Sequence, residues 1–151
     1  MLVASKDNNV KRFVFAASSS TYGDSESMPK VENVIGKPLS PYAITKYVNE
    51  LYADIFSKSY GLQTIGLRYF NVFGRRQDPN GAYAAVIPKF IELAVRGQAP
   101  TVFGDGLQTR DFVHVDDVAQ ALLMLAKEPW PSDFQHVYNV CTQTEISLQD
   151  L

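Results

Sequence analysis

Apolar residues along this chain occur either in short continuous runs or at helical spacing, and the alternation of the two predicts an α/β fold. Continuous runs at 13–17 and 64–70 have the length of buried parallel strands. Between them lies an apolar stripe at helical spacing, with Ser40 as the expected N-cap and Gly61 as the stop of a helix. The stripe consists of Val48, Leu51, Tyr52, Ile55 and Phe56. We interpret the aromatic residues Tyr47, Tyr52 and Phe56 of this helix as core or as a helix-packing surface and not as a ligand site. The strand, helix, strand order predicts parallel pairing.

The alternation continues after a turn-rich loop at 75–83. The pattern predicts a helix at 87–96, a short strand at 101–103, a strand at 112–115, a helix at 116–127 and a last strand at 137–140. These elements together predict part of a doubly wound, Rossmann-like parallel sheet with part of a smaller substrate-binding region.

The composition argues against several classes of partner. The formal net charge is -2 and the basic residues are scattered, which disfavours a nucleic-acid partner. The single cysteine, Cys141, cannot form an internal disulfide. The sequence shows neither a signal peptide nor an apolar run long enough to span a bilayer, so we expect a cytoplasmic protein without a membrane partner. His114 and His136 do not form a ligand cluster of usable spacing, and we expect no metal site.

Tyr42 and Lys46 stand four residues apart in the first predicted helix, so their side chains leave the same face. A phenol is a poor base at neutral pH because its pKa lies near 10, and a neighbouring ammonium favours the phenolate. Lowering that value by about three units requires roughly 4 kcal/mol, which a lysine and a cationic nicotinamide ring can supply together. Such a pair can take a proton from a hydroxyl group. The same spacing on a surface helix is also explained by a solvated or packed pair.

Polar residues follow both strands that flank this helix. Ser18, Ser19 and Ser20 come directly after the first strand, and Asn71 follows the second. Ligands of open α/β sheets bind beyond the carboxyl ends of the strands, so we expect these side chains at one sheet edge with the Tyr-Lys pair. Serine runs are also common in ordinary loops.

Four segments, in this order, resemble the extended short-chain dehydrogenase family. They are SSSTYG at 18–23, SPYAITK at 40–46, LRYFNVFG at 67–74 and RDFVHV at 110–115. The resemblance is to the NAD-dependent epimerase/dehydratase group of that family. The stretch 68–88 is similar to bacterial UDP-N-acetylglucosamine 4-epimerases.

The resemblance implies a role for each residue at a matching position. Tyr42 is then the catalytic base and acid, Lys46 its electrostatic partner and a donor to the cofactor ribose, and Ser18 a hydroxyl on the reacting sugar oxygen. The implied cofactor site contains Tyr42, Lys46, Phe70 and Ala17, with NAD as the cofactor. The implied substrate site contains Ser18, Ser19, Ser20, Asn71, Ala85, Val86, Thr101, Phe103 and Arg110. Arg110 suits a phosphate and Phe103 a uracil ring, with a surface ion pair to Asp105 or Asp111 as the alternative for Arg110.

The activity implied by the resemblance is a 4-epimerisation of UDP-GlcNAc and UDP-GalNAc, or of UDP-glucose and UDP-galactose. It proceeds through a 4-keto intermediate with transient hydride transfer to NAD+. Related dehydratases carry an Asp-Glu pair at the positions of Ser19 and Ser20, and decarboxylating members usually carry a glutamate at the second, so both activities are disfavoured alternatives. A non-catalytic nucleotide-sugar-binding protein, or an inert truncated member of the fold, is a further alternative. Small side chains at 18–20 and at 84–85 favour the N-acetylated substrates, and we expect a homodimer of the full-length protein.

A dinucleotide site needs glycines where the pyrophosphate meets a helix N-terminus, and neither G-x-x-G-x-x-G nor G-x-G-x-x-G occurs in the sequence. We therefore expect the chain to be the middle part of a longer enzyme, inactive and unable to hold NAD by itself. Residues 1–74 are then the C-terminal half of the NAD-binding Rossmann-like domain and 75–111 a substrate-binding excursion. Residues 112–141 return to the Rossmann-like domain, and 142–151 begin a C-terminal substrate region.

Overall fold

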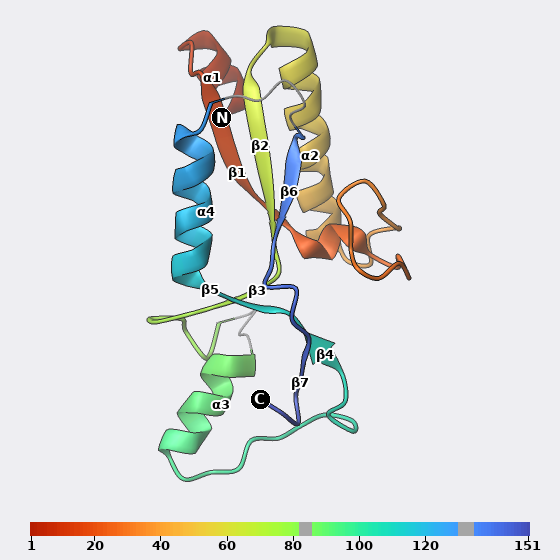
Figure 1. Cartoon of the computed structure of the whole chain (residues 1–151), viewed down its shortest axis with the longest axis vertical. Coiled ribbons are helices and arrows are strands. Elements are labelled where there is room, and N and C mark those ends of the chain that lie inside the picture. Colours follow the sequence, from red (N-terminus) through yellow and green to blue (C-terminus); the bar gives the residue numbers. More distant parts are fainter. Residues whose placement is uncertain (82–85, 130–134) are drawn as a thin grey trace. The chain divides into compact units, whose positions relative to one another are not determined.

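The computed structural model describes residues 1–81, 86–129 and 135–151, which form two compact units. The first unit comprises Met1–Tyr69 and Gln120–Val140, and the second comprises Phe70–Ala119 and Cys141–Leu151. Each unit has its own pairing of strands (Figure 1). The functional domain boundaries inferred from the sequence stay a prediction.

The first unit is built on a parallel sheet in the order β1 (Arg12–Ser18), β2 (Gln63–Tyr69) and β6 (Val137–Val140) (Figure 1). Ser18 of β1 lies opposite Tyr69 of β2, which in turn lies opposite Val140 of β6. The carboxyl ends of the three strands therefore meet at one edge of the sheet. The predicted α/β fold and the parallel pairing of the first two strands are confirmed.

The helix between β1 and β2 is α2 (Pro41–Tyr60), and its ends follow the predicted signals. The Ser40 hydroxyl accepts a hydrogen bond from Ala43 N at 3.1 Å, and Pro41 occupies the first turn. Gly61, with a φ of 68°, ends the helix in the left-handed conformation. The buried residues of α2 are Ala43, Glu50 and Ala53, and the helix packs on both β1 and β2.

The apolar stripe of α2 lies outside the core. Val48, Leu51, Tyr52 and Ile55 are 38%, 48%, 60% and 54% exposed. Small side chains face the sheet instead, because they allow the helix backbone to approach the strands closely. Of the aromatic residues interpreted as core or as a helix-packing surface, Tyr52 is exposed, and Tyr47 and Phe56 are half-buried. None of the three is in the buried core, so a helix-packing surface is the interpretation that remains.

A long loop follows β1 and the short 3-10 helix η1 (Ser19–Tyr22), and it closes on itself before α2 begins. Asp24 N donates to the Lys37 carbonyl at 3.1 Å, and Gly36 N donates to the carbonyl that ends η1 at 3.0 Å. Gly23 has a φ of 55°, and a Cβ at this position would lie 1.9 Å from the Lys37 carbonyl oxygen. Only glycine fits here, and the two ends of the loop meet at a narrow neck.

Two short ladders and a helix form the second unit. β3 (Asn71–Phe73) pairs in parallel with β5 (Phe112–His114), and β4 (Thr109–Arg110) pairs antiparallel with β7 (Ile146–Ser147). The helix α3 (Val86–Val95) follows the first of these strands. Phe112 and Val113 are buried in this unit.

The strand predicted at 101–103 is absent, since these residues have no regular structure. Phe103 is 82% exposed and precedes Gly104, whose φ is 78°. β-branched and aromatic residues favour strands only where a neighbouring strand completes the ladder, and no ladder includes this segment.

Two further helices are α1 (Leu2–Asp7), which the sequence pattern did not predict, and α4 (Val115–Lys127), which it did. The Arg12 guanidinium at the start of β1 donates to the carbonyls of Leu125 and Glu128 at the end of α4. Within the described residues, no helix is both long and apolar enough to cross a membrane. The same residues contain no group of three or more His, Cys, Asp or Glu side chains that could hold a metal ion.

Candidate active site

The three serines lie where β1 ends and η1 begins. Ser18 caps η1, and its hydroxyl oxygen accepts hydrogen bonds from Ser20 N at 3.2 Å and from Ser20 Oγ at 2.9 Å. Ser18 is buried, whereas Ser19 and Ser20 are half-buried. Because the Ser18 oxygen accepts two hydrogen bonds, the O–H of Ser18 can act as a donor to the oxygen of a ligand beside the turn.

Tyr42 and Lys46 come from the first turns of α2 and meet the end of β1. Lys46 Nζ donates to the Ala16 carbonyl at 2.9 Å and lies 5.6 Å from the centre of the Tyr42 ring. Tyr42 is 40% exposed. An ammonium has three donors, so the bond to Ala16 leaves Lys46 able to donate to a ligand hydroxyl beside the tyrosine. The structure thus brings Tyr42 and Lys46 to the strand end that carries Ser18.

A buried ion pair, which the sequence analysis missed, lies in the same unit. Arg68 of β2 binds Glu50 of α2 through Nη2 to Oε2 at 2.8 Å and Nε to Oε1 at 3.0 Å. The side chains are only 4% and 6% exposed. Burial alone lowers the pKa of Arg68, but hydrogen bonds and charge from Glu50, aided by Tyr22, hold that pKa above its ordinary value. The sequence did contain a sign of this ion pair: Arg68 is the single charge in the run 64–70, and a charge in a buried strand needs a partner.

The other predicted ligand residues lie in the second unit, apart from Ala17, which is buried at the end of β1. Phe70 precedes β3, Asn71 begins it, Val86 begins α3, and Thr101 and Phe103 lie in the loop before β4. Ala85 lies outside the described residues. The structure brings Asn71 next to the motif that carries Arg110, but the junction of these residues with the serine turn stays a prediction.

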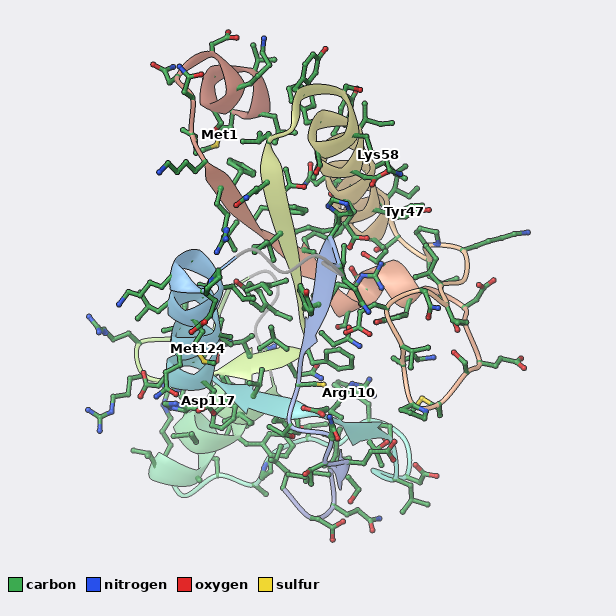
Figure 2. All side chains as sticks on the ribbon, turned by 45° about the horizontal axis from the view of Figure 1, so that its top comes forward. Met1, Tyr47, Lys58, Arg110, Asp117 and Met124 are labelled. Atoms are coloured by element: carbon green, nitrogen blue, oxygen red, sulfur yellow. The ribbon has the colours of Figure 1, made fainter. Side chains whose placement is uncertain are left out.

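Asp111 organises the segment around Arg110. Its carbonyl oxygen accepts hydrogen bonds from Asn71 N at 3.1 Å and Asn71 Nδ2 at 2.8 Å. Its carboxylate accepts from Thr142 N at 2.9 Å, Thr142 Oγ1 at 3.0 Å and Gln143 N at 2.8 Å. Arg110 lies in β4 (Figure 2). It is exposed, and its Nη1 donates to the Thr109 carbonyl at 2.7 Å. Asp111 therefore joins two predicted ligand residues to the chain segment after β6.

Comparisons with known proteins identify relatives of this chain. The NAD dependent epimerase/dehydratase family matches residues 1–141. A putative UDP-glucose 4-epimerase of Methanocaldococcus jannaschii is 43% identical over 144 residues, covering 95% of this chain and 45% of the relative. Nucleotide-sugar dehydratases are also among the matches.

Solved structures show the same relationship. The UDP-N-acetylglucosamine 4-epimerase of Methanobrevibacter ruminantium M1, in complex with UDP-N-acetylmuramic acid, has a TM-score of 0.90 at 45% identity, covering 97% of this chain and 46% of its own. The UDP-glucose 4-epimerase of Thermotoga maritima with UDP-glucose has a TM-score of 0.88 at 40% identity, covering 99% of this chain and 47% of its own. Other similar structures contain NAD. The predicted Rossmann-like fold class is confirmed, and the chain spans a little under half the length of these relatives.

Proposed function

The chain belongs to the NAD dependent epimerase/dehydratase family, and from this premise we propose that the full-length protein containing it is a nucleotide-sugar 4-epimerase. One observation carries the proposal: Lys46, which lies beside the Tyr42 ring, donates to the carbonyl of Ala16. Ala16 is two residues before Ser18 in β1. This edge offers a phenol, a cation and a hydroxyl donor, which suit reversible oxidation of a secondary alcohol. The similarity to UDP-sugar 4-epimerases supports the same reaction.

In the proposed reaction, Tyr42 removes the proton of the sugar 4-hydroxyl and later returns it to the 4-keto oxygen. Lys46 provides positive charge beside the phenol and donates to a ribose hydroxyl of the cofactor, and Ser18 donates to the reacting oxygen. The cofactor site would hold NAD+, which would supply a hydride acceptor that returns the hydride to the other face of the 4-keto sugar once the sugar has turned over, so the cycle would have no net redox change. Lys46 fits this role because its ammonium has three N–H donors and the bond to the Ala16 carbonyl uses only one of them. Ala17 and Phe70 complete the proposed cofactor site.

The serine turn favours epimerisation over elimination of water. Elimination needs a general acid and a base besides the tyrosine, and related dehydratases supply them as an Asp-Glu pair at the positions of Ser19 and Ser20. In this chain Ser20 Oγ binds Ser18 Oγ at 2.9 Å, so the turn offers hydroxyls in place of carboxylates. A dehydratase therefore remains the less favoured enzyme.

We propose UDP-N-acetylglucosamine as the substrate, interconverted with UDP-N-acetylgalactosamine. The small side chains at 18–20 leave room beside the sugar, and a UDP-N-acetylglucosamine 4-epimerase is 45% identical to the chain. UDP-glucose is the second candidate, because several of the similar proteins are named for it. The proposed nucleotide site consists of Asn71, Ala85, Val86, Thr101, Phe103 and Arg110. The ratio of kcat/KM for the two sugars decides between the candidates, and a higher value for UDP-glucose overturns the first.

The catalytic proposal is tested with Tyr42→Phe in the full-length protein. We expect epimerisation to be abolished while UDP-sugar binding persists, because only the phenol hydroxyl is lost. Tyr52→Phe is the matched control, since Tyr52 is 60% exposed on another face of the same helix. Near-normal turnover by Tyr42→Phe contradicts the proposal. UDP-sugar binding without turnover by the unaltered protein favours the non-catalytic alternative.

We also propose that the full-length protein is a homodimer that buries the exposed stripe of α2. Two copies related by a two-fold axis can bring the stripes of their α2 helices together, because such an interface uses the same surface twice. Leu51→Glu together with Ile55→Glu should then give a monomer in sedimentation equilibrium, whereas Lys89→Glu, at an exposed position of α3, should not. A monomeric unaltered protein contradicts this proposal. If the dimer survives both charges, the stripe packs against another part of the full-length protein and not against a second copy.

A further inference from the structure

The Arg68–Glu50 pair has no part in the proposed proton transfers, yet it is almost fully buried. Replacing a buried ion pair by apolar side chains of similar size is often neutral or stabilising, so stability alone is a weak reason for its presence. The pair is bidentate, which fixes the direction as well as the distance between β2 and α2. Its contacts therefore indicate what it holds in place.

Glu50 joins the helix of the Tyr-Lys pair to the serine turn. It follows Lys46 by four residues and Tyr42 by eight, so the three side chains lie along one face of α2. Thr21, the residue after Ser20, is fully buried and donates from Oγ1 to Glu50 Oε1 at 3.4 Å. A carboxylate carried by the helix of the Tyr-Lys pair thus contacts the segment that carries the serines.

Arg68 holds the same turn from the side of the sheet. Its guanidinium lies 4.8 Å from the centre of the Tyr22 ring, and Nη1 donates to the Glu32 carbonyl at 2.9 Å. Tyr22 in turn donates from its hydroxyl to Asn139 Oδ1 at 2.7 Å, which connects the turn to β6. The end of η1 is therefore fixed by α2 through Thr21 and by β2 and β6 through Tyr22.

We propose that Glu50 and Arg68 are positioning residues, which set the serine turn against the Tyr42–Lys46 face of α2. The proposal rests on the proposed epimerase function for its effect on rate. Neither side chain touches the substrate; both act through Thr21 and Tyr22. A displacement of about 1 Å in such an arrangement lowers turnover by about a hundredfold while leaving binding largely intact.

The test compares variants of the full-length protein in kcat, KM and amide hydrogen exchange. Glu50→Met with Arg68→Met removes both charges, and Thr21→Val removes one hydroxyl at nearly constant shape. We expect the double variant to lose about 10- to 100-fold in kcat, and Thr21→Val about threefold, with KM for the UDP-sugar changed by less than about threefold. The Ser20 and Gly23 amides, which bond to Ser18 Oγ and the Ser20 carbonyl, should exchange faster, while Ile65 in β2 keeps its protection. Lys58→Met is the matched control, because it removes an exposed ion pair with Asp54 on the same helix.

An unchanged kcat in either variant, or unchanged exchange at Ser20 and Gly23, overturns the positioning role. A parallel loss of protection in β2 also overturns it, because the pair would then support the fold as a whole. The proposed function fails separately: if Tyr42→Phe turns over normally, the epimerase assignment is wrong even where the exchange results hold, and the effect of the pair on rate is then wrong with it.

Discussion

Replacing Glu50 by glutamine removes a negative charge from the interior of the first unit and leaves the Arg68 guanidinium without its counter-ion. The two side chains are 6% and 4% exposed and their charged atoms are 2.8 Å apart, so water cannot take the place of the lost carboxylate. Removing one partner of a buried ion pair costs about 3–5 kcal/mol. The amide keeps one oxygen as an acceptor for Arg68, which places the expected loss near the lower end, about 3 kcal/mol.

Urea unfolding followed by circular dichroism measures this loss. Lys58→Met is the control, because the Lys58–Asp54 pair is 2.6 Å long but 66% and 31% exposed, and an exposed pair contributes less than about 1 kcal/mol. Glu50→Met combined with Arg68→Met should recover most of the stability, since no unpaired charge remains buried. A Glu50→Gln variant within about 1 kcal/mol of the unaltered protein would show that the pair is hydrated, and the reasoning would be refuted.

Three further changes test other contacts. Ser40→Ala removes the N-cap of α2 and should lower the free energy of unfolding by about 1 kcal/mol, measured by thermal unfolding. Asp111→Ala removes the acceptor of the Thr142 and Gln143 amides, so these two amides should exchange faster in hydrogen-exchange experiments. Burial raises the pKa of Tyr22 despite the opposing effect of Arg68, so the fold favours the neutral phenol. Its contribution to stability should be complete below the ordinary pKa near 10 and be lost as the pH rises through the raised value; titrating unfolding free energy from pH 8 to 11 should show a smaller fall in Tyr22→Phe.

The elements around the candidate site could be predicted where local chemistry decides the structure. The bounds of α2 follow from Ser40, Pro41 and Gly61, each of which acts through its own backbone or hydroxyl. The two apolar runs on either side of α2 form β1 and β2, because each run has the length and composition of a buried strand. The spacing of Tyr42 and Lys46 and the serines after β1 then placed three candidate groups at one sheet edge.

The rest depends on contacts between distant residues. Apolar periodicity marks a face of α2 but does not say whether the sheet covers it, and here Ala43 and Ala53 face the strands. The network of Glu50, Arg68 and Thr21 joins positions far apart in the sequence, so no local pattern reveals it. The segment 101–103 has the composition of a strand and no partner to pair with.

Because the two ends of the loop after η1 meet at a neck, the length of this loop can change without changing the geometry of the candidate site. A backbone hydrogen bond joins Asp24 and Lys37 at the two ends of the loop, and Glu32 within it binds Arg68 and Asn139. Residues inserted near Glu26, which is exposed, would enlarge the loop without changing the path from the serine turn to α2. Doubling the length of a flexible loop costs only about 0.6 kcal/mol. This position is therefore suited to an epitope or a fluorescent label that leaves Ser18 and Tyr42 in place.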